Sequence, residues 1–121
     1  MSIDYVAIVD RLTRVHGVHG AMVVSGTDGV VVAESLMEGI KGRALAALAG
    51  SLAARLAGLS RAAAGEKPQF IHLDAAEGAL LVAAGGPELL VVTLIGPEAP
   101  VGLARLETLR AAEQLAEGHP A

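Results

Sequence analysis

The stretch that most resembles a ligand-binding loop is rich in glycine. It reads VHGVHGAMVVSGTDGVVVAES over residues 15–35. A phosphate-binding loop needs a glycine-rich turn that opens a helix and ends in Lys followed by Ser or Thr. Here the glycines precede β-branched residues, and neither Lys41 nor Lys67 follows a glycine. We therefore expect a hairpin turn, with no nucleotide site and no other cofactor.

The histidines are the next candidates for chemistry. His16 and His19 are three residues apart, but Gly17 interrupts any helix that would present them together, and no thiolate or carboxylate lies close by in sequence. His72 and Asp74 alternate in a predicted strand, so their side chains share one face. A general-base pair is conceivable, but no third catalytic group accompanies it, and a polar strand face is the favoured interpretation. The sequence predicts no catalytic residue and no metal site.

Composition excludes several classes of protein. The 121 residues are 53% hydrophobic but only 2% aromatic, with a net charge of −4 and no cysteine. Such a chain is poorly suited to nucleic acid, which needs clustered basic residues, and it has no disulfide or thiolate metal site. No apolar run approaches the roughly 18 residues of a membrane span, and the N-terminus lacks the pattern of a signal peptide. We expect one cytoplasmic domain, residues 1–121, without membrane insertion.

The elements that must position these residues follow from changes in hydrophobic period. Apolar residues three and four apart predict helices over residues 2–16, 38–64 and 101–117. Runs rich in β-branched residues predict strands over residues 20–25, 30–35, 69–74, 78–84 and 88–95. Asp28 and Gly29 supply a tight turn between the first two strands. Short spacers make the last three strands an antiparallel meander, so the sequence predicts an α+β domain.

The long middle helix has an unusual side. We expect its leucines to face the core, namely Leu45, Leu48, Leu52, Leu56 and Leu59, as we expect of Leu103, Leu106 and Leu109 in the last helix. Opposite the first stripe lie two arginines separated by small residues: Arg43, Ala47, Gly50, Ala54, Ala57 and Arg61. No acidic residue occurs between Gly39 and Gly65. We interpret this smooth face as a partner-binding surface; the alternative is an ordinary exposed face in an alanine-rich chain.

These segments carry a resemblance to a known family. Gly17, Gly20, Asp28 and Gly29 match a pattern of Gly-Val-x-Gly-Ala, a short strand, Asp-Gly and a second strand. In this pattern the chain resembles the Roadblock family of dynein light chains and small-GTPase regulators. The resemblance continues through the middle helix, FIHLDAAEGALLVAAGGPELLVVTL and PVGLARLETLR, and covers nearly the whole chain. It implies a profilin-like or longin-like fold, a five-stranded antiparallel sheet flanked by helices.

The resemblance also implies partners. Members of the family usually dimerise through the third strand and the middle helix, and many bind a small Ras-like GTPase as a regulator or scaffold. The corresponding dimer edge strand in this chain consists of Gln69, Phe70, Ile71, His72 and Leu73. We expect a non-enzymatic homodimeric adaptor that activates or scaffolds a small GTPase. The alternative is a small-ligand-sensing module of the same fold, although an aliphatic core without convergent polar groups disfavours a pocket.

Overall fold

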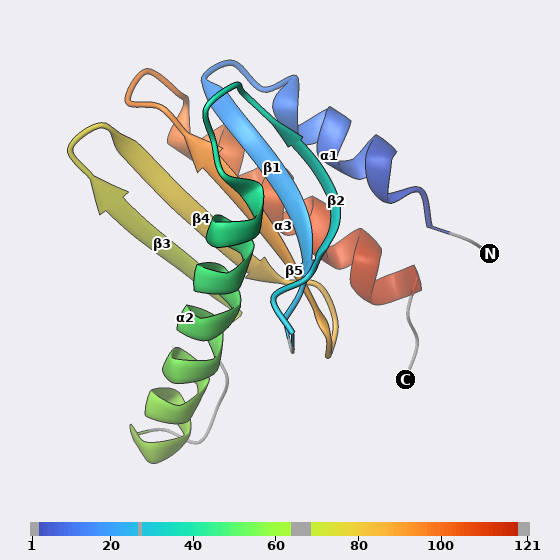
Figure 1. Cartoon of the computed structure of the whole chain (residues 1–121), viewed down its shortest axis with the longest axis vertical. Coiled ribbons are helices and arrows are strands. Elements are labelled where there is room, and N and C mark those ends of the chain that lie inside the picture. The colour runs from blue at the N-terminus through green and yellow to red at the C-terminus, as the bar shows by residue number, and fades with distance from the viewer. Residues whose placement is uncertain (1–2, 27, 64–68, 119–121) are drawn as a thin grey trace.

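The structure, a computed structural model, describes residues 3–26, 28–63 and 69–118. In these residues the elements follow the order α1 (Tyr5–Thr13), β1 (Val18–Ser25), β2 (Val31–Leu36), α2 (Gly42–Ala63), β3 (Phe70–Ala75), β4 (Gly78–Ala84), β5 (Leu89–Ile95) and α3 (Val101–Gly118). The strands form one antiparallel sheet in the order β2-β1-β5-β4-β3. Helices α1 and α3 cover one face, and α2 crosses the other (Figure 1). No described helix is long and apolar enough to cross a membrane.

The predicted order of elements and the five-stranded antiparallel sheet are confirmed, with boundaries that move by a few residues. Helix α1 begins after Asp4, whose carboxylate accepts a hydrogen bond from the Ala7 N–H at 3.0 Å and caps the helix. It ends at Thr13 rather than at residue 16, because the Arg14 N–H donates to the Arg11 carbonyl only three residues back. Helix α2 begins at residue 42 rather than 38.

Gly17 joins α1 to β1 at a point where no side chain fits. Its φ is +82°, and a Cβ atom there would lie 2.6 Å from the Ala99 Cα. The Gly17 carbonyl also accepts a hydrogen bond from the Gly96 N–H at 2.9 Å. Backbone therefore meets backbone where α1, β1 and the loop before α3 converge. Gly20 has a different role: it lies inside β1, where a Cβ would collide with the Leu36 side chain.

The predicted hairpin joins β1 to β2. Gly29 has a φ of +69°, and its N–H donates to the Ser25 carbonyl at 2.7 Å, so the turn closes on backbone hydrogen bonds. Asp28 is exposed at this turn, and Thr27 lies outside the described residues. The pairing register of the two strands shifts between Val23 and Val24, which leaves a β-bulge in the ladder.

Two apolar layers sandwich the sheet. On the α1 and α3 side, Ile8, Val9 and Leu12 of α1 pack with residues of β1, β5 and α3. On the other side, alanines of α2 pack against a second group that includes Met22, Val24, Val82 and Val92. Aliphatic side chains thus fill both layers, in keeping with the low aromatic content.

The predicted inner face of α3 is wrong in part. Leu103 and Leu106 are 46% and 44% exposed, whereas the buried residues of the helix are Ala104, Thr108, Ala111, Ala112 and Leu115. Small side chains let the helix approach β4 and β5 closely, and the long leucines lie at the border of this contact. Thr108 is held by its hydroxyl, which donates to the Ala104 carbonyl at 2.7 Å and accepts from the Thr93 hydroxyl at 2.8 Å.

Candidate interaction surface

Helix α2 turns small residues toward the sheet, and two of its five leucines lie on the exposed side. Ala46 and Ala49 are fully buried, and Gly50 is buried with the Cα of Gly29 at 3.4 Å from the place of its missing Cβ. Leu48 and Leu59, by contrast, are 68% and 64% exposed. The predicted orientation of the leucine stripe is therefore wrong at these two residues, and Gly50 does not belong to the exposed face.

Close approach explains this orientation. The β1–β2 turn brings its own glycine backbone against α2, and only a residue without a large side chain fits between two backbones at that distance. The leucine stripe and the alanine stripe both repeat with helical period, so periodicity alone could not decide between them. A signal was present in the sequence: Ala46, Ala49, Ala53 and Ala57 also recur three and four residues apart.

The rest of the predicted partner-binding face remains accessible. Arg43, Ala47, Ala54 and Arg61 are exposed, and Ala57 is half-buried. Arg43 and Arg61 are five helical turns apart, so they lie on one line along the helix with the two exposed alanines close to it. We call these four residues the arginine strip. The C-terminal half of α2 projects past the end of the sheet (Figure 1).

Strand β3 forms one edge of the sheet and pairs with β4 along its whole length, from Phe70 opposite Ala83 to Ala75 opposite Gly78. The Gln69 carbonyl accepts a hydrogen bond from the Ala84 N–H at 3.1 Å. Because bonding partners alternate in an antiparallel ladder, the backbone groups of the even-numbered residues point to the free edge. The predicted dimer edge strand therefore offers a regular row of donors and acceptors.

The side chains of β3 differ between its two faces. Ile71 packs in the layer under α2, and Leu73, opposite Leu80, is exposed. On the other face, His72 and Asp74 form the predicted side-by-side pair, with 2.9 Å between Nε2 and Oδ1. Phe70 on that face lies under the guanidinium of Arg105, 5.0 Å from its ring centroid.

The structure brings a carboxylate to His19 that the sequence had not indicated. The Glu98 Oε1 lies 3.3 Å from the His19 Nε2, across 79 residues of sequence. A hydrogen bond from its own backbone N–H, and then the bond with His19, lower the pKa of Glu98 from its ordinary value of 4.5. Both side chains are exposed, and within the described part of the chain no three His, Asp or Glu residues are placed to hold a metal ion.

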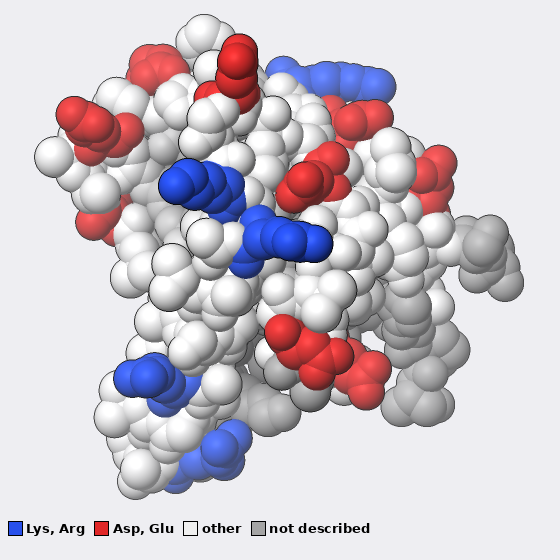
Figure 2. Space-filling model, viewed as in Figure 1, with Lys and Arg blue, Asp and Glu red and all other residues white. Residues whose placement is uncertain are grey.

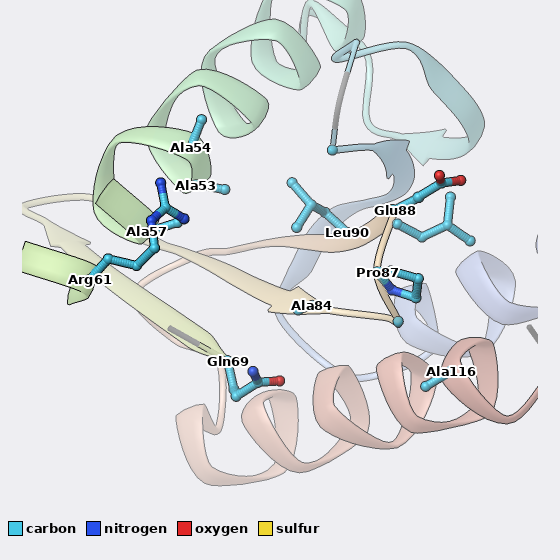
Figure 3. A pocket seen from close by; sticks show the side chains of 13 residues that line it. Ala53, Ala54, Ala57, Arg61, Gln69, Ala84, Pro87, Glu88, Leu90 and Ala116 are labelled. Atoms are coloured by element: carbon cyan, nitrogen blue, oxygen red, sulfur yellow. The ribbon is translucent and has the colours of Figure 1, made fainter. Parts of the chain in front are cut away.

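A cavity of about 610 Å³ lies beneath the second half of α2 (Figure 3). Its walls are mainly small apolar residues from four elements, including Ala53, Ala57, Ala84 and Leu90. Its polar lining residues are Arg61, Gln69 and Glu88, all of which are exposed. The polar side chains thus belong to residues that are open to solvent, and the other lining side chains are apolar.

The sheet order, the helices on both faces and the exposed edge define a small domain of the profilin-like class. A family model described as the Roadblock/LC7 domain matches residues 5–94. The chain belongs to the Roadblock/LC7 family, and this membership supports a role in the regulation of small GTPases.

Solved structures agree with this assignment. A structure titled "MglB with tetrameric arrangement" is 26% identical, with a TM-score of 0.84 over 93% of this chain and 85% of that one. Myxococcus xanthus MglB is 21% identical, with a TM-score of 0.86 over 93% and 92% of the two chains. Acanthamoeba castellanii profilin IB, 15% identical over 95% and 98%, has a TM-score of 0.68 and shares the fold. Among curated proteins, none matches the sequence.

Proposed function

We propose that this protein is a homodimeric adaptor that binds a small Ras-like GTPase and acts as its activator or scaffold, without catalysis of its own. Family membership and the likeness to MglB support the regulatory role. The observation that carries the proposal is the pair of unpartnered surfaces on one side of the sheet, namely the exposed leucines of α2 and the free edge of β3.

The free edge of β3 is the better of the two sheet edges for pairing with a second copy. The ladder of β3 is regular, whereas the opposite edge strand, β2, contains a bulge and packs beside α1. Bulges and covering elements discourage strand pairing at an edge. Two β3 strands in antiparallel pairing would join the sheets of two protomers and bring Leu73 of each toward the other's α2 side.

The GTPase is assigned to α2. Ala54 leaves its part of the helix surface smooth, so another helix can approach the backbone closely there, whereas the backbone at Ala47 already contacts Gly29 of the β1–β2 turn. Arg43, Arg55 and Arg61 are exposed, and an arginine supplied to a GTPase in trans can stabilise the transferred phosphoryl group. An activator would raise the rate of GTP hydrolysis by the partner, whereas a scaffold would bind without changing that rate.

The test combines mass, binding and hydrolysis. We expect light scattering to give a dimer of the 12.2 kDa chain at micromolar concentration and calorimetry to detect binding to a Ras-like GTPase of the same genome. A monomer at these concentrations would refute the dimer. Failure of every such GTPase to bind would refute the adaptor.

Ala54→Glu probes the α2 surface directly. Ala54 is exposed, so on a free surface the change alters stability by less than about 0.5 kcal/mol. In a packed contact the buried carboxylate costs several kcal/mol, of the order known for unpaired charges, and we expect partner capture or dimerisation to be lost while circular dichroism is unchanged. The matched control is Ala7→Glu, because Ala7 is an exposed alanine of α1, on the other side of the sheet. If Ala54→Glu binds and dimerises like the control, α2 is ordinary surface.

The cavity beneath α2 is the single observation in favour of the alternative, a small-ligand-sensing module. Ligand sites usually place a few polar groups within an apolar pocket. Here Arg61 and Gln69 are open to solvent, so water competes for them. A thermal-shift screen of small carboxylates and apolar metabolites tests this alternative, and a saturable rise in melting temperature that Arg61→Ala abolishes would favour it.

A further inference from the structure

Helix α2 carries charge of one sign, with three of the nine Lys and Arg residues of the chain. The helix contains Arg43, Arg55 and Arg61 and no acidic residue. Because the whole chain carries −4 and the helix +3, the remaining residues carry −7. Figure 2 shows several basic side chains along α2 with uncharged surface between them, a further basic group at the upper edge away from α2, and acidic groups over the rest of this side, one of them beside the upper basic groups. Helix α2 is therefore a basic element of an acidic protein.

These arginines have no partner within the described part of the chain. The ion pairs there join His19 to Glu98, His72 to Asp74 and Arg110 to Glu107, and none of them involves α2. A guanidinium has five N–H donors arranged to bind a carboxylate through two parallel bonds. Exposed arginines without intramolecular partners keep that capacity for another molecule.

The spacing of the arginine strip gives it a definite shape. Arg43 and Arg61 are separated by eighteen residues, so they lie roughly 27 Å apart along the helix at 1.5 Å per residue. Ala47 and Ala54 lie between them and project only a methyl group each. In the first half of this line the helix backbone around Ala47 and Gly50 already contacts Gly29 of the β1–β2 turn, so a partner meets the strip at Arg43 and, beyond the turn, at Ala54 and Arg61.

We infer that the arginine strip receives an acidic surface of the GTPase partner, with carboxylates placed to meet Arg43 and Arg61. This inference rests on the proposed function and adds the chemistry of the partner's surface. A second copy of α2 fits the strip poorly, because its arginines would face like charges. An anionic membrane fits poorly as well, since the surrounding protein carries −7 and would be repelled.

Charge reversal tests the inference. Arg43→Glu/Arg61→Glu and Arg11→Glu/Arg14→Glu change the net charge equally, and the second pair of residues is exposed at α1, across the sheet from α2. The association rate with the GTPase, loaded with a non-hydrolysable GTP analogue, is measured at 50 and 400 mM NaCl. For the wild type we expect this rate to fall with salt, because complementary charges accelerate encounter. We expect the α2 variant to associate about tenfold more slowly at low salt and to lose most of its salt dependence.

Controls separate charge from folding. Arg43→Lys/Arg61→Lys should keep the salt dependence, because the charges remain, while losing part of the affinity, because lysine cannot form the two parallel bonds. Light scattering and circular dichroism verify that each variant keeps the dimer and the fold of the wild type. Vesicles containing phosphatidylserine serve as the membrane probe.

The outcomes are distinct. If the GTPase binds the wild type and both glutamate variants at equal, salt-independent rates, the inference is wrong and the adaptor role stands. If the α2 variant loses its dimer along with the GTPase, the strip belongs to the dimer and the inference is also wrong. Binding of the wild type to the vesicles, abolished only in the α2 variant, would assign the strip to a membrane and overturn it. Absence of any GTPase complex with the wild type overturns the proposed function and the inference together.

Discussion

Replacing Gly50 by larger residues tests how closely α2 packs against the β1–β2 turn. A Cβ at this position would lie 3.4 Å from the Gly29 Cα, 3.6 Å from the Gly26 carbonyl oxygen and 3.7 Å from the Gly29 nitrogen. All three distances are ordinary van der Waals contacts, so one methyl group fits. Glycine inside a helix costs about 1 kcal/mol relative to alanine. We therefore expect Gly50→Ala to raise the free energy of unfolding by about 1 kcal/mol.

Gly50→Leu should instead lower the free energy of unfolding. Its further three carbons would have to enter space held by the backbone of the β1–β2 turn, which is not a flexible side chain. Overpacking of this kind costs roughly 1–3 kcal/mol, and it exceeds the gain in helix propensity. Gly58 is the matched control on the same helix, because a Cβ there meets only the end of the Arg61 side chain, at 4.0 Å. Gly58→Leu should be neutral or stabilising.

Urea unfolding followed by circular dichroism measures the three variants, at one fixed protein concentration because association adds to apparent stability. Equal effects of Gly50→Leu and Gly58→Leu on the free energy of unfolding would contradict the packing of Gly50 against the β1–β2 turn. That result would place residue 50 on an open face, with the leucines turned to the sheet as periodicity alone suggests. A loss of stability in Gly50→Ala would instead mean that the helix lies closer to the turn than the structure places it.

Three further predictions concern other parts of the molecule. Thr108→Val should lower the free energy of unfolding by roughly 1–3 kcal/mol, because it leaves the buried Thr93 hydroxyl without its acceptor. In urea unfolding, the double variant Thr93→Val/Thr108→Val should lose less stability than the sum of the two single variants. Leu59→Asp should leave circular dichroism unchanged but reduce the mass in light scattering from dimer to monomer, and a persistent dimer would exclude Leu59 from the interface. For Glu98, whose pKa is lowered in the folded state, the stabilisation is present above pH 4.5 and is lost as the pH falls through the lowered pKa; the melting temperatures of Glu98→Gln and wild type should therefore differ at pH 6 and converge once the pH has fallen below the lowered pKa.

The sequence predicts the fold well because each element has its own clear period. The alternating strands, the turn at Asp28 and Gly29 and the helical repeats need only local information, and they fix the order of elements. The position of β3 at the edge of the sheet came from the family resemblance. Sheet order depends on contacts between segments far apart in the chain, which no local pattern specifies.

The orientation of the helices is less predictable, and the reason is size. Sequence patterns place the most hydrophobic stripe inside, but a helix that approaches a sheet within backbone contact distance needs the smallest residues there. In both α2 and α3 small residues face the sheet: Ala46 and Ala104 are fully buried, while Leu48 and Leu106 are exposed. The His19–Glu98 pair and the cavity under α2 are unpredictable for another reason, since both depend on residues brought together only by the complete fold.

The same choice of small residues links folding to association. A leucine moved from water to a packed interior contributes about 1.5–3 kcal/mol, and Leu48 and Leu59 gain little of this within one chain because most of their surface is exposed. By packing alanine and glycine against its own sheet, α2 keeps that stabilisation available to a second molecule. The arginine strip lies on another side of the helix from these leucines, so one helix can present an apolar surface to a second copy and a basic surface to an acidic partner.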